Sequence, residues 1–294
     1  MDFNYKLKYM QDIINEYLNS IIPIEHQYIK TILDSMRYSL LSGGKRIRPV
    51  LTLGTGEIFG CPYDDLLPYG ASIEMIHTYS LIHDDLPAMD NDDYRRGKLT
   101  NHKVFSEAIS ILAGDGLLNF AFENIIEYAS KKNDMKYIIA ALEIAHASGI
   151  WGMVGGQVVD IENEGKMIEK KTMDYMHANK TGAIINACVK TGAIIAGASE
   201  NDITQLSYYA HDLGLAFQVI DDILDVIGDE KKMGKKTGSD IKKNKATYVS
   251  MYGIDEAKKI ANQLSQSALS HIEYFGDDSI FLKQLTLYLL NRDY

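Results

Sequence analysis

The stretch SLIHDDLPAMDNDDYRRGKLTNH, residues 80–102, combines a dense run of acidic residues with apolar neighbours. Five aspartates fall within ten positions, and two arginines, Arg95 and Arg96, follow directly. The aspartates are Asp84, Asp85, Asp90, Asp92 and Asp93. Carboxylates this close repel one another, and burying an unpaired carboxylate beside apolar residues is costly. The pattern therefore predicts a positively charged partner that offsets the repulsion.

The spacing of these aspartates predicts a bent backbone. Asp84 and Asp90 are six residues apart, so on a straight helix their side chains would point away from each other. Pro87 lies between them and removes a backbone donor, which interrupts a helix. A bend at this proline would return Asp90 toward Asp84.

A second acidic cluster, QVIDDILD at residues 218–225, has helical spacing. Asp221 and Asp225 are four apart and share one helical face, with Asp222 beside them. Apolar residues surround these acids, whereas a solvated charged face would mix them with lysines. A single DDxxD is often an ordinary surface feature, but two such clusters on apolar helices favour a functional site.

Carboxylate pairs of this kind suit hard, oxygen-seeking cations. Mg²⁺ binds proteins through one or two carboxylates, several waters and substrate phosphates. The two clusters therefore predict Mg²⁺ ions that bridge a diphosphate. Arg95 and Arg96 would add guanidinium donors for the phosphate oxygens.

Basic residues cluster in GGKRIRP, residues 43–49, where two glycines allow close approach to a ligand. Lys45, Arg46 and Arg48 suit an anion there, although a surface turn would carry the same residues. Together with Arg96 they suggest a second phosphate site without aspartates.

Three further features have two interpretations each. His77 lies seven residues before Asp84 on nearly the same helical face, so it either donates to a phosphate or packs in the core. Lys180 in HANKTG either binds an anion or extends along an apolar helix to reach solvent. The basic loop 228–244 is either solvated or folds over bound phosphate.

The composition is that of an acidic globular protein. The chain has 294 residues, 46% hydrophobic and 24% charged, with a formal net charge of −10, which argues against nucleic acid or anionic lipid as the main partner. Cys61 and Cys188 form no CxxC pair, so neither a disulfide framework nor a zinc site is expected. Segment 181–198 contains Asn186 and Lys190 and is too polar to span a membrane. We expect a soluble, cytoplasmic protein.

Apolar residues recur at three- and four-residue spacing along most of the chain, which is typical of amphipathic helices. Predicted helices occupy residues 5–19, 25–41, 50–59, 66–82, 104–130, 134–150, 170–197 and 202–227, with two more near the C-terminus. No change in composition marks a domain boundary. The expectation is one all-α domain, residues 1–294, with about ten or more helices.

Together these motifs resemble the short-chain trans-polyprenyl diphosphate synthases, most closely the bacterial farnesyl diphosphate synthases. GGKRIRP, the first Asp-rich stretch, GMVGGQVVDI at 153–162, KTG at 180–182 and FQVIDDILD occur in the family's order. Tyr94 and Leu99 depart from the family, which commonly has Leu and Pro there, but neither is a predicted ligand. The resemblance implies a helical bundle around a deep central cavity, and a homodimer.

The resemblance also implies a Mg²⁺-assisted, head-to-tail condensation of isopentenyl diphosphate with dimethylallyl or geranyl diphosphate. Three Mg²⁺ ions, replaceable by Mn²⁺, would hold the allylic diphosphate between the two acidic motifs. The implied metal-binding residues are Asp84, Asp85, Asp90, Asp221, Asp222 and Asp225. The implied allylic diphosphate site is Arg95, Lys180 and Lys235, and the isopentenyl diphosphate site is Lys45, Arg48, His77 and Arg96. The implied catalytic residues are Lys180, Thr181 and Gln218.

Product length is expected to depend on the helix before Asp84. By resemblance, the aromatic Tyr79, five residues earlier, forms the floor of a cavity for a C15 chain. Ser80 lies one turn before Asp84, so helical geometry alone does not single out Tyr79. The expected product is farnesyl diphosphate, with geranylgeranyl (C20) and geranyl (C10) diphosphate as alternatives.

Three other functions share parts of the pattern. A class I terpene cyclase would have one DDxxD and needs no second diphosphate site. A serine acyl-enzyme would use SGGK at 42–45 and KTG, but two glycines follow Ser42 and KTG would lie on a strand. A non-catalytic regulatory subunit would have lost its acidic motifs, and both are intact here.

Overall fold

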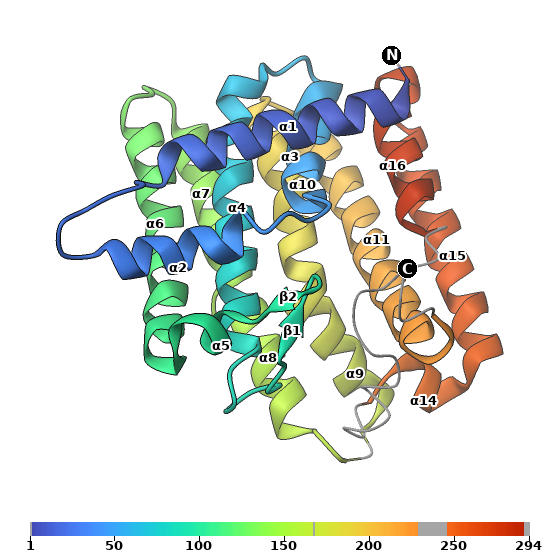
Figure 1. Cartoon of the computed structure of the whole chain (residues 1–294). Helices are drawn as coiled ribbons and strands as arrows, with labels where there is room; N and C mark the ends of the chain where they lie inside the picture. The colour runs from blue at the N-terminus through green and yellow to red at the C-terminus, as the bar shows by residue number, and fades with distance from the viewer. Residues whose placement is uncertain (1, 167, 229–245, 291–294) are drawn as a thin grey trace.

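The computed structural model of the chain describes residues 2–166, 168–228 and 246–290, and these form an almost entirely helical fold (Figure 1). The strands within these described ranges are a single short antiparallel pair, β1 (Tyr94–Arg95) and β2 (Lys98–Leu99). The predicted all-α fold is confirmed.

The described residues contain the following helices. In chain order they are α1 (Phe3–Ile21), α2 (Lys30–Leu40), α3 (Ile47–Ile58), α4 (Tyr63–Asp84), α5 (Asn101–Phe105), α6 (Glu107–Ser130), α7 (Met135–Ser148), α8 (Met153–Glu162), α9 (Lys170–His177), α10 (Ala183–Ile195), α11 (Glu200–Ile227), α14 (Tyr248–Tyr252), α15 (Ile254–Glu273) and α16 (Ile280–Leu290). A π-helix, η1 (Ala178–Gly182), joins α9 to α10, and a 3-10 helix, η2 (Gly276–Ser279), precedes α16.

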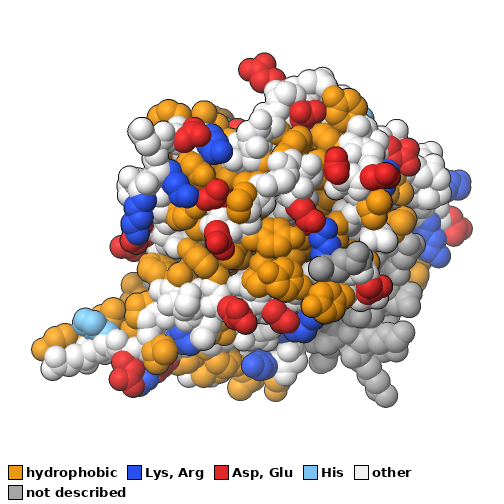
Figure 2. All heavy atoms as spheres, turned by 90° about the horizontal axis from the view of Figure 1, so that it is seen from above, with side chains coloured by type: hydrophobic (Ala, Val, Ile, Leu, Met, Phe, Trp, Pro, Cys, Tyr) orange, Lys and Arg blue, Asp and Glu red, His pale blue; other side chains and the backbone are white. Residues whose placement is uncertain are grey.

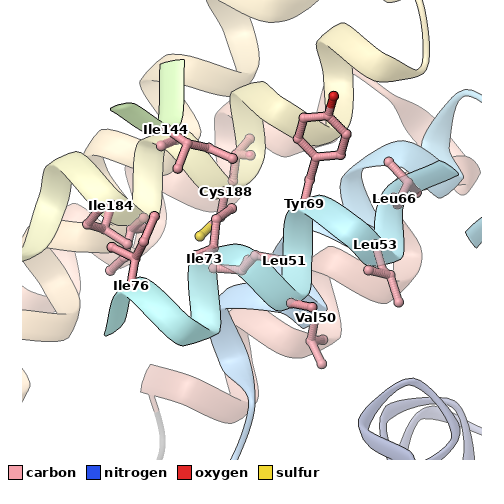
Figure 3. Close-up of a cluster of buried hydrophobic side chains, with 14 of the residues drawn as sticks. Val50, Leu51, Leu53, Leu66, Tyr69, Ile73, Ile76, Ile144, Ile184 and Cys188 are labelled. Atoms are coloured by element: carbon pink, nitrogen blue, oxygen red, sulfur yellow. The ribbon is translucent and has the colours of Figure 1, made fainter. Parts of the chain in front are cut away.

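The centre of the hydrophobic core lies where α3, α4, α7 and α10 meet (Figure 3). Its side chains include Val50, Leu51, Leu53, Leu66, Tyr69, Ile73, Ile76, Ile144, Ile184 and Cys188. Helix α10 packs closely on α3 because Gly192 has no side chain; a Cβ there would lie 2.4 Å from Thr52 O. Burying a large aliphatic side chain stabilises a fold by roughly 1.5–3 kcal/mol, so this core holds α4 firmly in place.

Local signals explain where the helices begin. Asp2 caps α1 by accepting a hydrogen bond from Tyr5 N, and Ser199 with Asp202 forms a capping box at the start of α11. Helix α1 then buries residues at the three- and four-residue spacing of the sequence pattern. These residues are Leu7, Met10, Ile14 and Leu18.

The sequence-based helix prediction was wrong in four places, one of which is Ser106, whose φ of 95° separates α5 from α6 inside the helix predicted over 104–130. The helix predicted from residue 25 begins at Lys30, because Ile24 and Tyr28 are 64% and 82% exposed in a linker that projects from the body (Figure 1). The helix predicted over 170–197 is interrupted by the π-helix η1. Helix α8 was not predicted, because its glycines lower helix propensity.

One side of the molecule exposes large apolar residues. The stretches 107–130 and 135–162 are, by length and composition, apolar enough to cross a membrane, yet only part of each is buried in the fold. The residues Ile111, Leu112, Ile126, Ile138, Ile139 and Leu142, here called the α6–α7 surface, are all at least 45% exposed. On the face seen in Figure 2, by contrast, hydrophobic, acidic and basic side chains are interspersed. Apolar patches of this kind commonly mark interaction sites.

Candidate active site

The first acidic motif follows the C-terminal end of α4. The helix ends at Asp84, the chain turns around Pro87, and Asp90 N donates a hydrogen bond to Asp84 O over 2.8 Å. Asn91 continues the turn in the left-handed region, with φ of 54°. The predicted return of Asp90 toward Asp84 is therefore confirmed for the backbone.

Asp85 forms an ion pair with Arg95 beside this turn. Arg95 Nε lies 2.8 and 2.9 Å from the two carboxylate oxygens, and its Nη2 lies 2.6 Å from Oδ1. Burial raises the pKa of Asp85, although Arg95 opposes the shift. The pair holds a guanidinium next to the acidic motif, with the Arg95 side chain still 33% exposed.

The carboxylate of Asp84 lies in an unfavourable environment for a negative charge. Burial raises the pKa of Asp84 above its ordinary value, Asp90 and Asp85 add to the shift, and Lys180 opposes it. An additional cation would stabilise the ionised form. The sequence pattern predicts such a positive partner, and this stays a prediction.

Helix α8 connects this carboxylate to Lys180. Gln157 Nε2 donates to Asp84 Oδ1 over 3.1 Å, and Asp160 Oδ2 accepts from Lys180 Nζ over 2.5 Å. Gly156 permits the close approach, because a Cβ there would lie 2.2 Å from Lys180 N. One short helix therefore orients both an acidic and a basic side chain of the site.

Gln157 and Asp160 were missed at the sequence level as site residues. They lie inside the stretch GMVGGQVVDI, which was recognised as a family motif, but no role was given to either side chain because their partners lie in distant segments. The three-residue spacing of the pair, which places both side chains on one helical face, is the signal that could have found them.

Lys180 and Thr181 lie in η1, and single π-helical turns are often found at functional sites. Thr181 Oγ1 donates to Gln218 Oε1 over 3.0 Å, and Gln218 Nε2 donates to Asp222 Oδ1 over 2.9 Å. Tyr248 N donates to the other oxygen of Asp222 over 2.8 Å. The KTG motif is thus helical rather than on a strand, which argues against a serine acyl-enzyme.

These contacts, together with residues that are neighbours on α8 and η1, form a series of polar side chains from the first acidic motif to the second. This series is here called the polar chain. Its residues are Asp84, Gln157, Asp160, Lys180, Thr181, Gln218 and Asp222. Asp221 and Asp225 lie on α11 within two turns of Gln218, and Asp225 is only 2% exposed. The polar chain therefore runs from an acidic residue of α4 to an acidic residue of α11 by way of Lys180.

The glycine turn of GGKRIRP lies against Arg96. Arg96 donates a hydrogen bond to Gly43 O, and a Cβ at Gly44 would lie 2.7 Å from the Arg96 guanidinium. Arg96 itself adopts a left-handed backbone, with φ of 52°. The two basic segments that the sequence suggests for a second phosphate site therefore meet in space.

His77 and Arg48 belong to the same basic group. Burial lowers the pKa of His77 well below its ordinary value, and the nearby Arg48 and Arg96 charges add to the shift. Arg48 Nε is buried and has no hydrogen-bond partner in the part of the chain that the structure describes. A buried, unpaired guanidinium N–H beside other cations is well suited to an anionic ligand.

The remaining predicted diphosphate residue is Lys235, which lies outside the described residues. The same is true of the basic loop 228–244, apart from Gly228. The proposed role of this loop stays a prediction.

Tyr79 and Ser80 occupy different environments on α4. Tyr79 is 7% exposed and meets the ring of His83 edge to face, with ring centroids 5.7 Å apart. Ser80 Oγ donates to His77 O over 2.9 Å, so its hydroxyl is used within the helix. Tyr79 is therefore the bulkier of the two, and its ring packs against His83.

The donor atoms suit Mg²⁺ that is bound together with a substrate. Carboxylate oxygens are the ligands that this hard cation prefers. Over residues 2–166, 168–228 and 246–290, however, no three His, Cys, Asp or Glu side chains are grouped closely enough to hold a metal alone. Substrate phosphates and water would have to complete the coordination, as is usual for Mg²⁺.

The chain is similar in sequence and in structure to known proteins. Residues 29–274 match the family described as polyprenyl synthetase. The geranylgeranyl diphosphate synthase of Cyanophora paradoxa is 45% identical over 96% of this chain and 94% of that protein. The farnesyl diphosphate synthase of Geobacillus stearothermophilus is 42% identical over 97% of this chain and 98% of that protein. The solved geranyltransferase of Helicobacter pylori, complexed with magnesium and isoprenyl diphosphate, has a TM-score of 0.87 and 27% identity, covering 99% of this chain and 97% of that chain.

Proposed function

We propose that this chain, which belongs to the polyprenyl synthetase family, condenses isopentenyl diphosphate with dimethylallyl and geranyl diphosphates to give farnesyl diphosphate. The family resemblance of the motifs is confirmed, and the chain is a trans-prenyltransferase. Related proteins carry both farnesyl and geranylgeranyl names, so the C15 product is part of the proposal. The observation that carries the proposal is the polar chain, which joins two acidic motifs around Lys180.

The acidic residues take the metal-binding role in this proposal. Asp84, Asp90, Asp221 and Asp225 would hold Mg²⁺, and we propose three ions per site. The solved geranyltransferase of Helicobacter pylori is complexed with magnesium and isoprenyl diphosphate, which supports the choice of metal. Asp85 and Asp222 would support these ligands from nearby, because Asp85 already accepts hydrogen bonds from Arg95 and Asp222 from the Gln218 amide. The raised pKa of Asp84 supports this assignment, since a bound cation would offset the cost of its buried charge.

The same residues account for ionisation of the allylic substrate. When bound, Mg²⁺ neutralises charge on the diphosphate leaving group. Lys180 and Arg95 donate to the diphosphate oxygens and stabilise the charge that develops as the C–O bond breaks. Thr181 and Gln218 present oxygen atoms beside the resulting allylic cation.

The second substrate accounts for the basic group without aspartates. Lys45, Arg48, His77 and Arg96 would bind the diphosphate of isopentenyl diphosphate. Its double bond then attacks the allylic cation, a new C–C bond forms, and a proton is lost to the released diphosphate. A class I terpene cyclase needs no such second site, so the buried, unpaired Arg48 Nε favours the condensation.

The assignment of a C15 product depends on Tyr79. Its buried ring lies one to two turns before Asp84 on α4 and would block a longer chain. The alternative activities are synthesis of geranylgeranyl diphosphate (C20) and of geranyl diphosphate (C10). Each would give a product of a different length from C15 in the same assay.

A second copy of the chain is the proposed occupant of the α6–α7 surface. Its exposed residues, such as Leu142 at 66%, would be costly to leave in water, and a homodimer would bury them. In the turn after α7, Ile150 and Trp151 are also exposed, each at 68%. We therefore propose a cytoplasmic homodimer rather than a membrane-inserted chain.

The decisive experiment supplies the purified chain with dimethylallyl diphosphate, isopentenyl diphosphate and Mg²⁺, and identifies the products by chain length. The expected result is mainly C15 product that requires both substrates. Matched reactions omit isopentenyl diphosphate or replace Mg²⁺ with EDTA. Product release from the allylic substrate alone would favour a terpene cyclase, and failure to condense the two substrates would overturn the proposal.

A further inference from the structure

We propose that Gln11, Asn15 and Arg46 form a positioning device that holds the GGKR segment in shape for isopentenyl diphosphate. The inference rests on the proposed function, because it assigns this segment to the second substrate. It concerns residues that do not touch the substrate themselves. Helix α1, which crosses the bundle near this segment in Figure 1, is the element that supplies two of them.

Arg46 differs from its basic neighbours because its side chain points into the protein. It is 3% exposed, and its backbone is left-handed with φ of 50°. Its Nη1 lies 2.7 Å from Glu74 Oε1, its Nη2 lies 2.7 Å from Leu40 O, and its Nε lies 2.9 Å from Asn15 Oδ1. All three guanidinium nitrogens are therefore hydrogen-bonded, so Arg46 is a structural anchor rather than a phosphate ligand.

The anchor joins three helices to the segment. Asn15 belongs to α1, Leu40 ends α2, and Glu74 lies on α4. Glu74 precedes His77 by three residues, so the same turn of α4 carries both the anchor's carboxylate and a proposed substrate ligand. Any shift of Arg46 would therefore change the position of GGKR relative to His77.

Gln11 provides a second attachment, one turn before Asn15 on α1. Its Nε2 donates to Lys45 O over 2.8 Å. The two amides therefore bind consecutive residues of the segment, one through the main chain of Lys45 and one through the side chain of Arg46. Their four-residue spacing places both on the same helical face.

The backbone conformation of the segment gives these attachments their importance. Residues 43–46 lie between α2 and α3 without regular secondary structure. Gly43 and Gly44 have φ of 90° and 127°, conformations that give glycine wide freedom in the unattached chain. The position of Lys45 and the approach of Arg96 to Gly43 would vary without the contacts from α1.

The test measures KM for each substrate separately in Gln11→Ala and Asn15→Ala variants of the full chain. Losing one hydrogen bond typically costs about 1 kcal/mol, so KM for isopentenyl diphosphate should rise roughly three- to tenfold in each variant. KM for geranyl diphosphate, product length and kcat at saturating substrates should stay close to wild type. Asp12→Ala is the matched control, since Asp12 lies on the same helix but pairs with Lys8 in solvent.

Arg46→Lys extends the test by retaining the charge while losing the forked geometry. It should raise KM for isopentenyl diphosphate more than either amide variant. If it fails to fold, the two amide variants decide alone. Unchanged KM values, or equal rises for both substrates, would overturn the positioning role while leaving the enzyme's function intact. Wild-type protein without condensation activity would overturn the proposed function, and this inference with it.

Discussion

Gln157 Nε2 donates to Asp84 Oδ1 over 3.1 Å, although 73 residues separate the two positions in the chain. One turn further along α8, Asp160 holds the ammonium group of Lys180 at 2.5 Å. A single helix therefore orients both Asp84 of the first acidic motif and Lys180, the proposed ligand of the diphosphate leaving group. If Asp84 binds metal and Lys180 binds diphosphate, as proposed, this arrangement would couple the two, because moving α8 would displace both side chains.

Gln157→Leu and Asp160→Asn should each lower kcat/KM for the allylic substrate. Residues that orient metal ligands typically change activity by about 10- to 100-fold when replaced. Steady-state kinetics across a Mg²⁺ titration would also show a higher Mg²⁺ requirement. Val158→Ala is the control, because Val158 lies between the two positions and is 47% exposed. Kinetics that match this control in both variants would exclude the orienting role of α8.

Asp84→Asn should abolish turnover and stabilise the metal-free protein. We expect activity to fall by about a thousandfold or more, since a metal ligand and its charge are lost. The folded pKa of Asp84 is raised, so its ionisation opposes folding, and stability is lost as the pH rises through that folded pKa. Asparagine does not ionise and escapes this loss.

The thermal midpoint of Asp84→Asn, measured in EDTA, should therefore exceed that of wild type near pH 7. The difference should shrink as the pH falls from the raised folded pKa toward the ordinary carboxyl pKa, and it should vanish below that, where both proteins are neutral at this position. Excess Mg²⁺ with a diphosphate should stabilise wild type only. Parallel midpoints from pH 4 to pH 8 would contradict a costly charge at Asp84, and near-normal turnover of the variant would contradict its metal role.

Tyr79→Ala should lengthen the product from C15 to C20 or beyond. The ring is buried and held against His83, so its removal would open space along α4. Product length by chromatography of the dephosphorylated alcohols gives the measurement. Tyr79→Phe keeps the ring and should keep C15, and Ser80→Ala should change little because the Ser80 hydroxyl bonds within its helix. An unaltered C15 product from Tyr79→Ala would remove Tyr79 as the floor.

Leu142→Lys should weaken self-association of the chain. A charge in the centre of an apolar interface is costly to bury, so the variant should shift from dimer toward monomer. Light scattering coupled to gel filtration would measure the mass. Leu287→Lys is the matched control, because Leu287 is 45% exposed on α16, on the other side of the bundle in Figure 1. A wild-type monomer, or an unaffected dimer, would argue against this interface.

The helical fold could be predicted because it depends on local periodicity. Leu7, Met10, Ile14 and Leu18 repeat at helical spacing, and they are the buried residues of α1. The linker residue Tyr28 fitted the same pattern but is 82% exposed, because periodicity does not report whether another element covers a face. Helix α8 escaped prediction for the opposite reason, since packing on η1 requires the glycine that lowers its propensity.

The sequence by itself determined the chemistry of this protein: two carboxylate clusters, their spacing, and basic residues in motifs typical of one family. Only the tertiary structure decided that Arg46 anchors the glycine turn while Arg48 keeps an unpaired N–H, although the two residues look alike in the motif. Only the fold, likewise, brought Gln157 and Asp160 to their partners. The physical reason is that residue type sets what a side chain can bind, whereas its actual partner depends on contacts between segments far apart in the chain.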